Sequence, residues 1–123
     1  ADRPMFKAGT ATPYARTFAL FREISKVINR LPNRIAISGH TDATPYRRVD
    51  GAGNWEVSME RALVSRRALQ DVGISSKRFF EVTGKADTEP LFPDDPFLPG
   101  NRRISITLMK EAPALAPRAL SPD

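Results

Sequence analysis

The sequence predicts an α+β fold, an α/β sandwich in which a mixed sheet is covered by two main helices. Two segments, 14–31 and 55–72, have the three- and four-residue spacing of apolar side chains that is typical of amphipathic helices. Short apolar segments, most of them with alternating polar residues, predict strands at 34–38, 79–83 and 104–108. With a further short strand at Met5-Phe6, the predicted order is β-α-β-α-β-β.

The first helix is predicted from a long apolar stripe that would pack against the core. Its members recur every three or four residues, and Pro32 then ends the helix. The stripe consists of Tyr14, Phe18, Phe21, Ile24, Ile28 and Leu31, widened by Leu20 and Val27.

The next strand and helix are separated by a loop. Ile35 and Ile37 define the strand, which Gly39 ends, and residues 43–53 contain one proline and two glycines, which is typical of a loop. Asn54 is the expected N-cap of the second helix, and Gly73 is expected to end it.

The last part of the chain is predicted to contain two strands, a long loop and a tail. Residues 84–100 hold four prolines and two glycines and are expected to form the loop, with at most one helical turn. From Glu111 the composition becomes rich in alanine and proline without any period. We therefore expect one folded domain over 1–110 and a disordered tail over 111–123.

Composition excludes several classes of function. The chain has no cysteine, so it has neither a disulfide nor a thiolate metal site, and its single histidine indicates neither a metal nor a cofactor. The net charge is +5, but the basic residues occur as separated pairs among 14 acidic residues, so the pattern does not favour nucleic acid as a partner. No apolar run approaches the ~18 residues of a membrane-spanning helix.

One charged residue stands out on the second helix. At about 100° per residue, Arg61 is the only charge in the apolar arc that Val57, Val64 and Leu69 define. A buried arginine needs a partner, and Asp42, just beyond the preceding strand, is the obvious carboxylate. Two alternatives remain open: a closed Arg61–Asp42 bridge, or two charges that flank a pocket for a small zwitterion.

Several motifs resemble those of the OmpA-like peptidoglycan-binding domain. They are PMFKAGTA at 4–11, LPNRIAISGHTDATPY at 31–46, NWEVSMERA at 54–62, GKADTEPLFPDDP at 84–96 and NRRISI at 101–106. The resemblance covers roughly residues 4–109 and is strongest to the flagellar motor stator branch, the MotB-type proteins. It implies the OmpA C-terminal-like fold and non-covalent binding of the diaminopimelate residue in a peptidoglycan stem peptide.

The resemblance also implies roles for residues and for partners. Asp42 would bind the ligand's ammonium and Arg61 its carboxylate, while Thr41, Asn54 and Arg102 would line the pocket. The domain would be a periplasmic homodimer that anchors a stator to the cell wall. MotA-type stator subunits would surround a single inner-membrane helix that lies outside these 123 residues.

Three other functions compete with this one. A generic tether from the outer membrane to the wall would use the same site. An interaction module would present Arg47, Arg48, Arg66 and Arg67 to flagellar basal-body ring proteins. An enzyme would use His40 with Asp42 and a serine, but a catalytic triad requires all three groups within mutual hydrogen-bond reach, which this spacing does not favour. We therefore expect no enzymatic activity.

Overall fold

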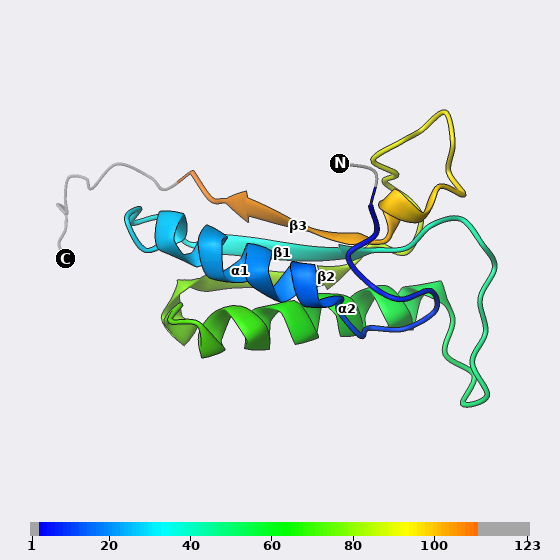
Figure 1. Ribbon diagram of the computed structural model, residues 1–123, viewed down its shortest axis with the longest axis horizontal. Coiled ribbons are helices and arrows are strands. Elements are labelled where there is room, and N and C mark those ends of the chain that lie inside the picture. Colours follow the sequence, from blue (N-terminus) through cyan, green and yellow to red (C-terminus); the bar gives the residue numbers. More distant parts are fainter. Residues whose placement is uncertain (1–2, 111–123) are drawn as a thin grey trace, which may run out of the picture.

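A computed structural model of the chain describes residues 3–110 and has two helices, three strands and two short 3-10 turns. Both helices run alongside the sheet, and the loops that follow β1 and β2 gather at one end of the molecule (Figure 1). The elements are α1 (Ala15–Ile28), β1 (Ile35–His40), α2 (Asn54–Asp71), η1 (Ser76–Arg78), β2 (Phe79–Gly84), η2 (Pro99–Asn101) and β3 (Arg103–Leu108). The predicted α+β class is confirmed.

The sheet is mixed, and β1 is its central strand. The order is β2-β1-β3, with β2 parallel and β3 antiparallel to β1. Ile37 is paired with Val82 on one side and with Ile106 on the other. Because β1 is the central strand, the segment that follows it begins in the middle of one end of the sheet, next to α2 and β3.

The apolar core lies between the sheet and the two helices. Phe21 of α1, Leu69 of α2 and Ile35 and Ile37 of β1 are at most 1% exposed, and Phe6 joins them from the N-terminal segment. Burial of such side chains is worth roughly 1.5–3 kcal/mol each and is the main force that holds the layers together.

The predicted apolar stripe of α1 is wrong in part. Phe18, Leu20 and Val27 are 41%, 44% and 54% exposed, whereas Thr17 and Ser25 are buried. The two hydroxyls are tolerated inside because each donates a hydrogen bond to a backbone carbonyl, at 2.7 Å to Met5 and 2.8 Å to Arg22 respectively. α1 therefore buries only a narrow arc, although its sequence is apolar over a wider one.

Two local predictions are also wrong. Met5-Phe6 is not a strand, because Phe6 forms only an isolated bridge with Pro13 and Met5 donates its N–H to the carbonyl of Arg102. Asn54 is not the N-cap of α2, since the cap is Gly53, whose N–H is satisfied by the Glu56 carboxylate at 2.8 Å. The Asn54 amide donates instead to the carbonyl of Thr44 at 3.0 Å.

Two predicted boundaries are wrong as well. Gly39 does not end β1, because it is paired with Gly84 and Ile104 and the strand continues to His40, and α1 ends at Ile28, before Leu31 and Pro32. The remaining boundaries agree with the sequence patterns. α2 ends just before Gly73, and the 84–100 loop contains the single turn η2. The expected tail over 111–123 lies outside the described residues. Within residues 3–110, neither helix combines the length and the apolar character needed to cross a bilayer.

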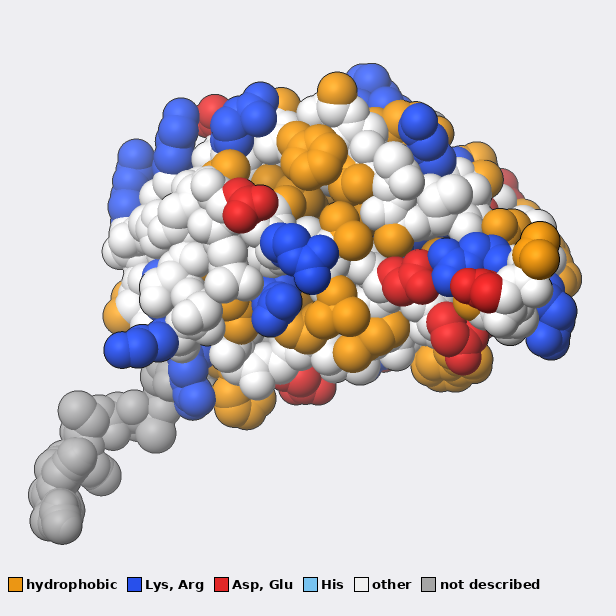
Figure 2. Space-filling model, turned by 90° about the horizontal axis from the view of Figure 1, so that it is seen from below, with side chains coloured by type: hydrophobic (Ala, Val, Ile, Leu, Met, Phe, Trp, Pro, Cys, Tyr) orange, Lys and Arg blue, Asp and Glu red, His pale blue; other side chains and the backbone are white. Residues whose placement is uncertain are grey.

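The outward face of α2 is polar with isolated apolar residues. Met59 and Leu63 are both 37% exposed, and the same face carries Glu56 and Arg67. Figure 2, which views the molecule from the side on which α2 lies, shows hydrophobic and charged side chains interspersed over this surface. Such mixing is ordinary for a solvated helix face.

A candidate ligand pocket at the end of the central strand

A small pocket lies where β1 ends. Its volume is about 150 Å³, and the walls come from the N-terminal segment, the loop after β1, the first turns of α2 and the residue that precedes β3. The lining residues are Ala8, Gly9, Thr41, Asp42, Thr44, Tyr46, Asn54, Val57, Arg61 and Arg102. The structure thus brings together the five residues that the sequence singled out: Thr41, Asp42, Asn54, Arg61 and Arg102.

A close approach between β1 and α2 places Arg61 beneath the strand end. A Cβ atom on Gly39 would lie 1.9 Å from the carbonyl oxygen of Ser58, so only glycine allows the helix to lie this near the strand. A Cβ atom on Gly84 of β2 would likewise lie only 2.7 Å from the backbone nitrogen of Met59. The two glycines therefore fix the depth at which the first half of α2 sits on the sheet.

Arg61 is buried without a carboxylate partner. Its side chain is among the largest fully buried ones, at 1% exposure, and no acidic group within residues 3–110 lies in salt-bridge distance of it. Its guanidinium donates to three backbone carbonyls: Nε to Thr10 at 2.7 Å, Nη1 to His40 at 2.8 Å and Nη2 to Lys7 at 3.4 Å. The Phe6 ring lies 5.2 Å from the guanidinium carbon.

The environment of Arg61 disfavours its positive charge. Burial, followed by the positive charge of Arg102, lowers the pKa of Arg61 to about 10, and the charges of Asp42 and Glu60 offset only part of this shift. Arg61 still carries its proton at neutral pH. It therefore presents a desolvated positive charge that a ligand carboxylate would stabilise.

Asp42 pairs with Arg102 rather than with Arg61. Oδ2 of Asp42 accepts from Arg102 Nη1 at 3.0 Å, Oδ1 accepts from the backbone N–H of Thr44 at 2.9 Å, and both side chains are 11% exposed. Arg102 is held in turn by a bond from its Nε to the carbonyl of Phe6 at 3.1 Å. The closed Arg61–Asp42 bridge, one of the two alternatives from the sequence, is therefore not formed.

Thr41 and Asn54 complete the polar wall. The backbone N–H of Thr41 donates to the carbonyl of Ala86 at 2.8 Å, but its buried hydroxyl has no hydrogen-bond partner in the structure. An unpaired buried hydroxyl is costly, of the order of 1–3 kcal/mol, so a hydrogen bond from a ligand atom or a water molecule would stabilise it.

Sequence reasoning missed the contribution of the N-terminal segment. Residues 7–10 form a tight turn that supplies two of the three carbonyls for Arg61, and Gly9 at its tip has φ +68°. The Tyr46 ring packs on Gly9 so closely that a Cβ there would lie 2.4 Å from Cε1. Backbone carbonyls leave no side-chain signature, so only the motif resemblance at 4–11 pointed to this segment.

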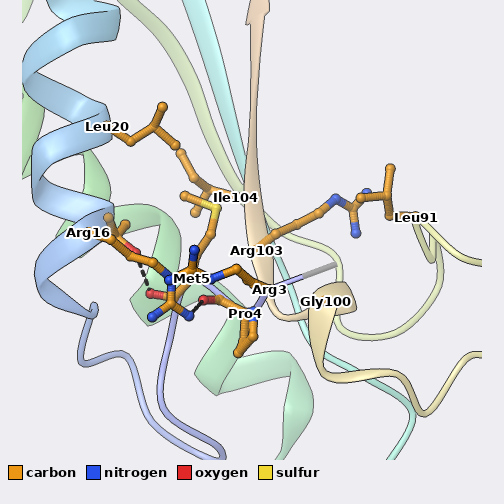
Figure 3. Close-up of a pocket in the computed structure, with 10 residues that line it drawn as sticks. Arg3, Pro4, Met5, Arg16, Leu20, Leu91, Gly100, Arg103 and Ile104 are labelled. Atoms are coloured by element: carbon orange, nitrogen blue, oxygen red, sulfur yellow. Dashed lines mark hydrogen bonds between the residues drawn. The ribbon is translucent and has the colours of Figure 1, made fainter. Parts of the chain in front are cut away.

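A larger hollow lies elsewhere and lacks the chemistry of the first. It has a volume of about 560 Å³ and lies between α1, the N-terminal segment and β3 (Figure 3). Arginine and apolar side chains line it, and none of the described lining residues is acidic. Two of its arginines donate to backbone carbonyls, Arg16 to Pro4 at 2.5 Å and Arg103 to Glu89 at 3.0 Å. A ligand ammonium would find no counter-charge here.

His40 is a buried structural residue. It is 1% exposed, its Nε2 lies 3.0 Å from Ser105 Oγ, and its Nδ1 has no partner within the described chain. Burial and the charge of Arg103 lower its pKa from 6.5 to about 4. Asp42 is engaged with Arg102 and Thr44, so the three groups of a Ser-His-Asp triad are not assembled.

Comparison with known proteins places this architecture in one family. A model of the OmpA family matches residues 5–98. The chain is 42% identical over 113 residues to Motility protein B of Escherichia coli strain K12, a match that covers 89% of this chain but only 36% of that protein.

Solved structures share the fold. The C-terminal domain of Helicobacter pylori MotB matches with a TM-score of 0.77 at 23% identity, covering 92% of this chain and 89% of that one. The cell wall anchor of the T6SS from Pseudomonas aeruginosa matches with a TM-score of 0.72 at 25% identity, covering 87% and 76%. By the match of its sequence to the family model and to the Escherichia coli motility protein, the chain belongs to the OmpA family.

Proposed function

We propose that this domain binds peptidoglycan non-covalently, holding the diaminopimelate residue of a stem peptide, and thereby anchors a flagellar motor stator to the cell wall. The observation that carries the proposal is the arrangement of Arg61, a buried guanidinium with no carboxylate of its own, in one pocket with Asp42 and the unpaired hydroxyl of Thr41. The 42% identity to a motility protein supports the biological setting.

The chemistry of the pocket assigns a role to each group. A guanidinium has five N–H donors, and the three carbonyls around Arg61 leave one donor on each terminal nitrogen for a ligand carboxylate. Each oxygen of Asp42 accepts one hydrogen bond within the protein and retains a lone pair for a ligand ammonium. Together they recognise the free amino-acid end of a diaminopimelate side chain.

The size of the pocket agrees with a small polar ligand group. A volume of about 150 Å³ equals that of roughly five water molecules at ~30 Å³ each. It accommodates the ammonium and the carboxylate at one end of a diamino acid, and the sugar strand of peptidoglycan would stay outside. Binding would therefore depend on the stem peptide.

The assembly in which the domain would work is proposed by analogy with its relatives. In this proposal the domain is periplasmic and dimeric, and a membrane segment outside these residues connects it to MotA-type stator subunits. A generic wall tether is the second candidate, favoured by the likeness to a cell wall anchor of a different machine. The two assemblies would use the same pocket and would differ in the attached segment.

Sedimentation with isolated sacculi tests the proposal. We expect the purified domain to sediment with Gram-negative sacculi, and Asp42→Asn and Arg61→Ala to remain in the supernatant. Loss of a charge-assisted contact typically costs ~2–5 kcal/mol, which is enough to abolish a weak single-site interaction. Melting curves of each variant would separate lost binding from lost folding.

Asp50→Asn is a matched control for Asp42→Asn. Asp50 also accepts from a backbone N–H two residues ahead, at 3.0 Å, and from an arginine, Arg48, at 3.1 Å, but it lies outside the pocket. This variant should sediment like the unmodified domain. If Asp42→Asn and Arg61→Ala fold and still sediment normally, the binding site is elsewhere.

A further inference from the structure

The charges of the strand-end pocket do not balance. Three of its lining residues are charged: Asp42 contributes one negative charge, while Arg61 and Arg102 contribute one positive charge each. The sum, −1 + 2, is +1. A zwitterionic ligand group, with one ammonium and one carboxylate, would leave this surplus uncompensated among three charged side chains that are at most 11% exposed.

The hydrogen bonds of the charged side chains show a matching excess of donors over acceptors. The one carboxylate of the pocket is already bound by Arg102, which within residues 3–110 also donates to the carbonyl of Phe6. Arg61 uses carbonyls alone, and the Thr41 hydroxyl has no partner. The two guanidinium groups, which can only donate, thus face a single carboxylate, which favours a ligand whose charged groups supply more acceptors than donors.

We propose that the pocket selects a ligand with one ammonium and two carboxylates, and that Arg102 binds the second carboxylate. This inference rests on the proposed function and narrows it to stem peptides in which both carboxylates of that unit are free. Arg61 is 1% exposed, and the Arg102 side chain is 11% exposed. The carboxylate beside the ammonium therefore reaches inward to Arg61, and the second one stays nearer the mouth with Arg102.

The pocket's size agrees with this division. A volume of about 150 Å³ suits one end of a diaminopimelate, with the other end at the mouth of the pocket. Arg102 can bind both Asp42 and the ligand because its guanidinium has five donors.

Converting the second carboxylate of the ligand to a primary amide preserves its shape but removes its charge. The change also replaces an acceptor with a group that carries donors.

Two soluble probes of almost equal size test the inference on the unmodified domain. Diaminopimelate acetylated on one amino group carries one ammonium and two carboxylates. In the second probe, the carboxylate next to the acetylated nitrogen is a primary amide. We expect calorimetric titration, or displacement of the domain from sacculi, to give the dicarboxylate an affinity about ten- to a hundredfold higher.

Variants locate the effect. In Arg102→Gln the preference for the dicarboxylate should fall to less than about threefold, and melting curves would confirm that the variant is folded. Arg103→Gln is the matched control: Arg103 is the next residue, donates to the carbonyl of Glu89 and lines the other hollow, so the preference should be unchanged.

The outcomes separate this inference from the proposed function. Equal affinity for the two probes, or displacement by neither while sacculi still retain the domain, overturns the inference and leaves wall binding in place. A preference that survives in Arg102→Gln overturns the role of Arg102. If the domain is not retained by sacculi, the proposed function itself fails.

Discussion

At the scale of single residues, Arg61 combines a structural role with the binding role proposed above. Its three carbonyl acceptors come from the N-terminal turn and from the end of β1, so the side chain ties two distant segments to α2. The same contacts orient the guanidinium towards the pocket. Sequence periodicity was enough to predict that this arginine faces inward, because helical phase is a local property.

Arg61→Lys tests whether the planar fork is required. A lysine ammonium has three donors on one atom and cannot reach three separated carbonyls while it also holds a carboxylate. We expect sedimentation with sacculi to be lost and the free energy of unfolding to fall by about 1–3 kcal/mol, measured by urea denaturation. Retention at the unmodified level would show that a point charge is sufficient.

His40 predicts a pH dependence of stability. Its pKa is about 4 in the folded chain and near 6.5 when unfolded, so the unfolded chain binds the proton more readily. The neutral imidazole's contribution is therefore fully present above pH 6.5 and is lost as the pH falls towards 4. The total change is of the order of 3 kcal/mol.

The measurement is urea denaturation between pH 7.5 and 4. The reference is His40→Gln, which keeps a polar group near Ser105 but cannot titrate. Carboxylates also titrate in the lower part of this window, so the quantity of interest is the difference in the free energy of unfolding between the two proteins. Parallel stability curves would show that His40 contributes no pH dependence.

At the scale of elements, the packing of α2 on β1 positions the pocket. The helix approaches to a depth that only glycine at position 39 permits. Patterns in the sequence predicted both elements well, but they also predicted an N-terminal strand that does not form and a wider buried arc on α1 than the structure has. Those two errors share a cause, because the pairing of a segment and the burial of a face depend on tertiary neighbours that local patterns do not contain.

Gly39→Ala should disturb both stability and binding. Its Cβ would lie 1.9 Å from a backbone oxygen, so no rotamer change relieves the clash and α2 must shift outward. We expect a loss of about 1–3 kcal/mol or more in the free energy of unfolding, together with weaker retention by sacculi.

Gly53→Ala provides the comparison, since the nearest atom to its Cβ is 3.4 Å away and its φ is −111°. This variant should change the stability by less than about 1 kcal/mol. Equal stability of the two variants would mean that the strand–helix distance is not constrained.

At the scale of the whole molecule, the site combines residues that are far apart in the chain. Asp42 and Arg102 are separated by 60 positions, and Arg61 contacts residues more than 50 positions away. The motif resemblance identified the five lining residues, whereas the pairing of Asp42 with Arg102 required the folded structure. Charge arithmetic on the sequence alone would have matched Asp42 to either arginine.

The net charge of +5 would add a long-range attraction to anionic wall material in the proposed function. Exposed charges are screened over about 10 Å at 0.1 M salt, while contacts inside a pocket are screened much less. We therefore expect retention of the unmodified domain by sacculi to fall only partly between 50 and 300 mM salt. Residual retention of the Asp42→Asn, Arg61→Ala double variant should disappear over the same range. If both proteins respond identically to salt, surface charge alone explains the retention.

The three backbone carbonyls that hold Arg61 have a practical consequence for inhibitor discovery. A receptor group that is already immobilised loses little further freedom when a small molecule docks, so compounds of very few heavy atoms can achieve useful affinity per atom. Fragment libraries rich in amino dicarboxylates would be the natural starting point for compounds that detach this domain from its support.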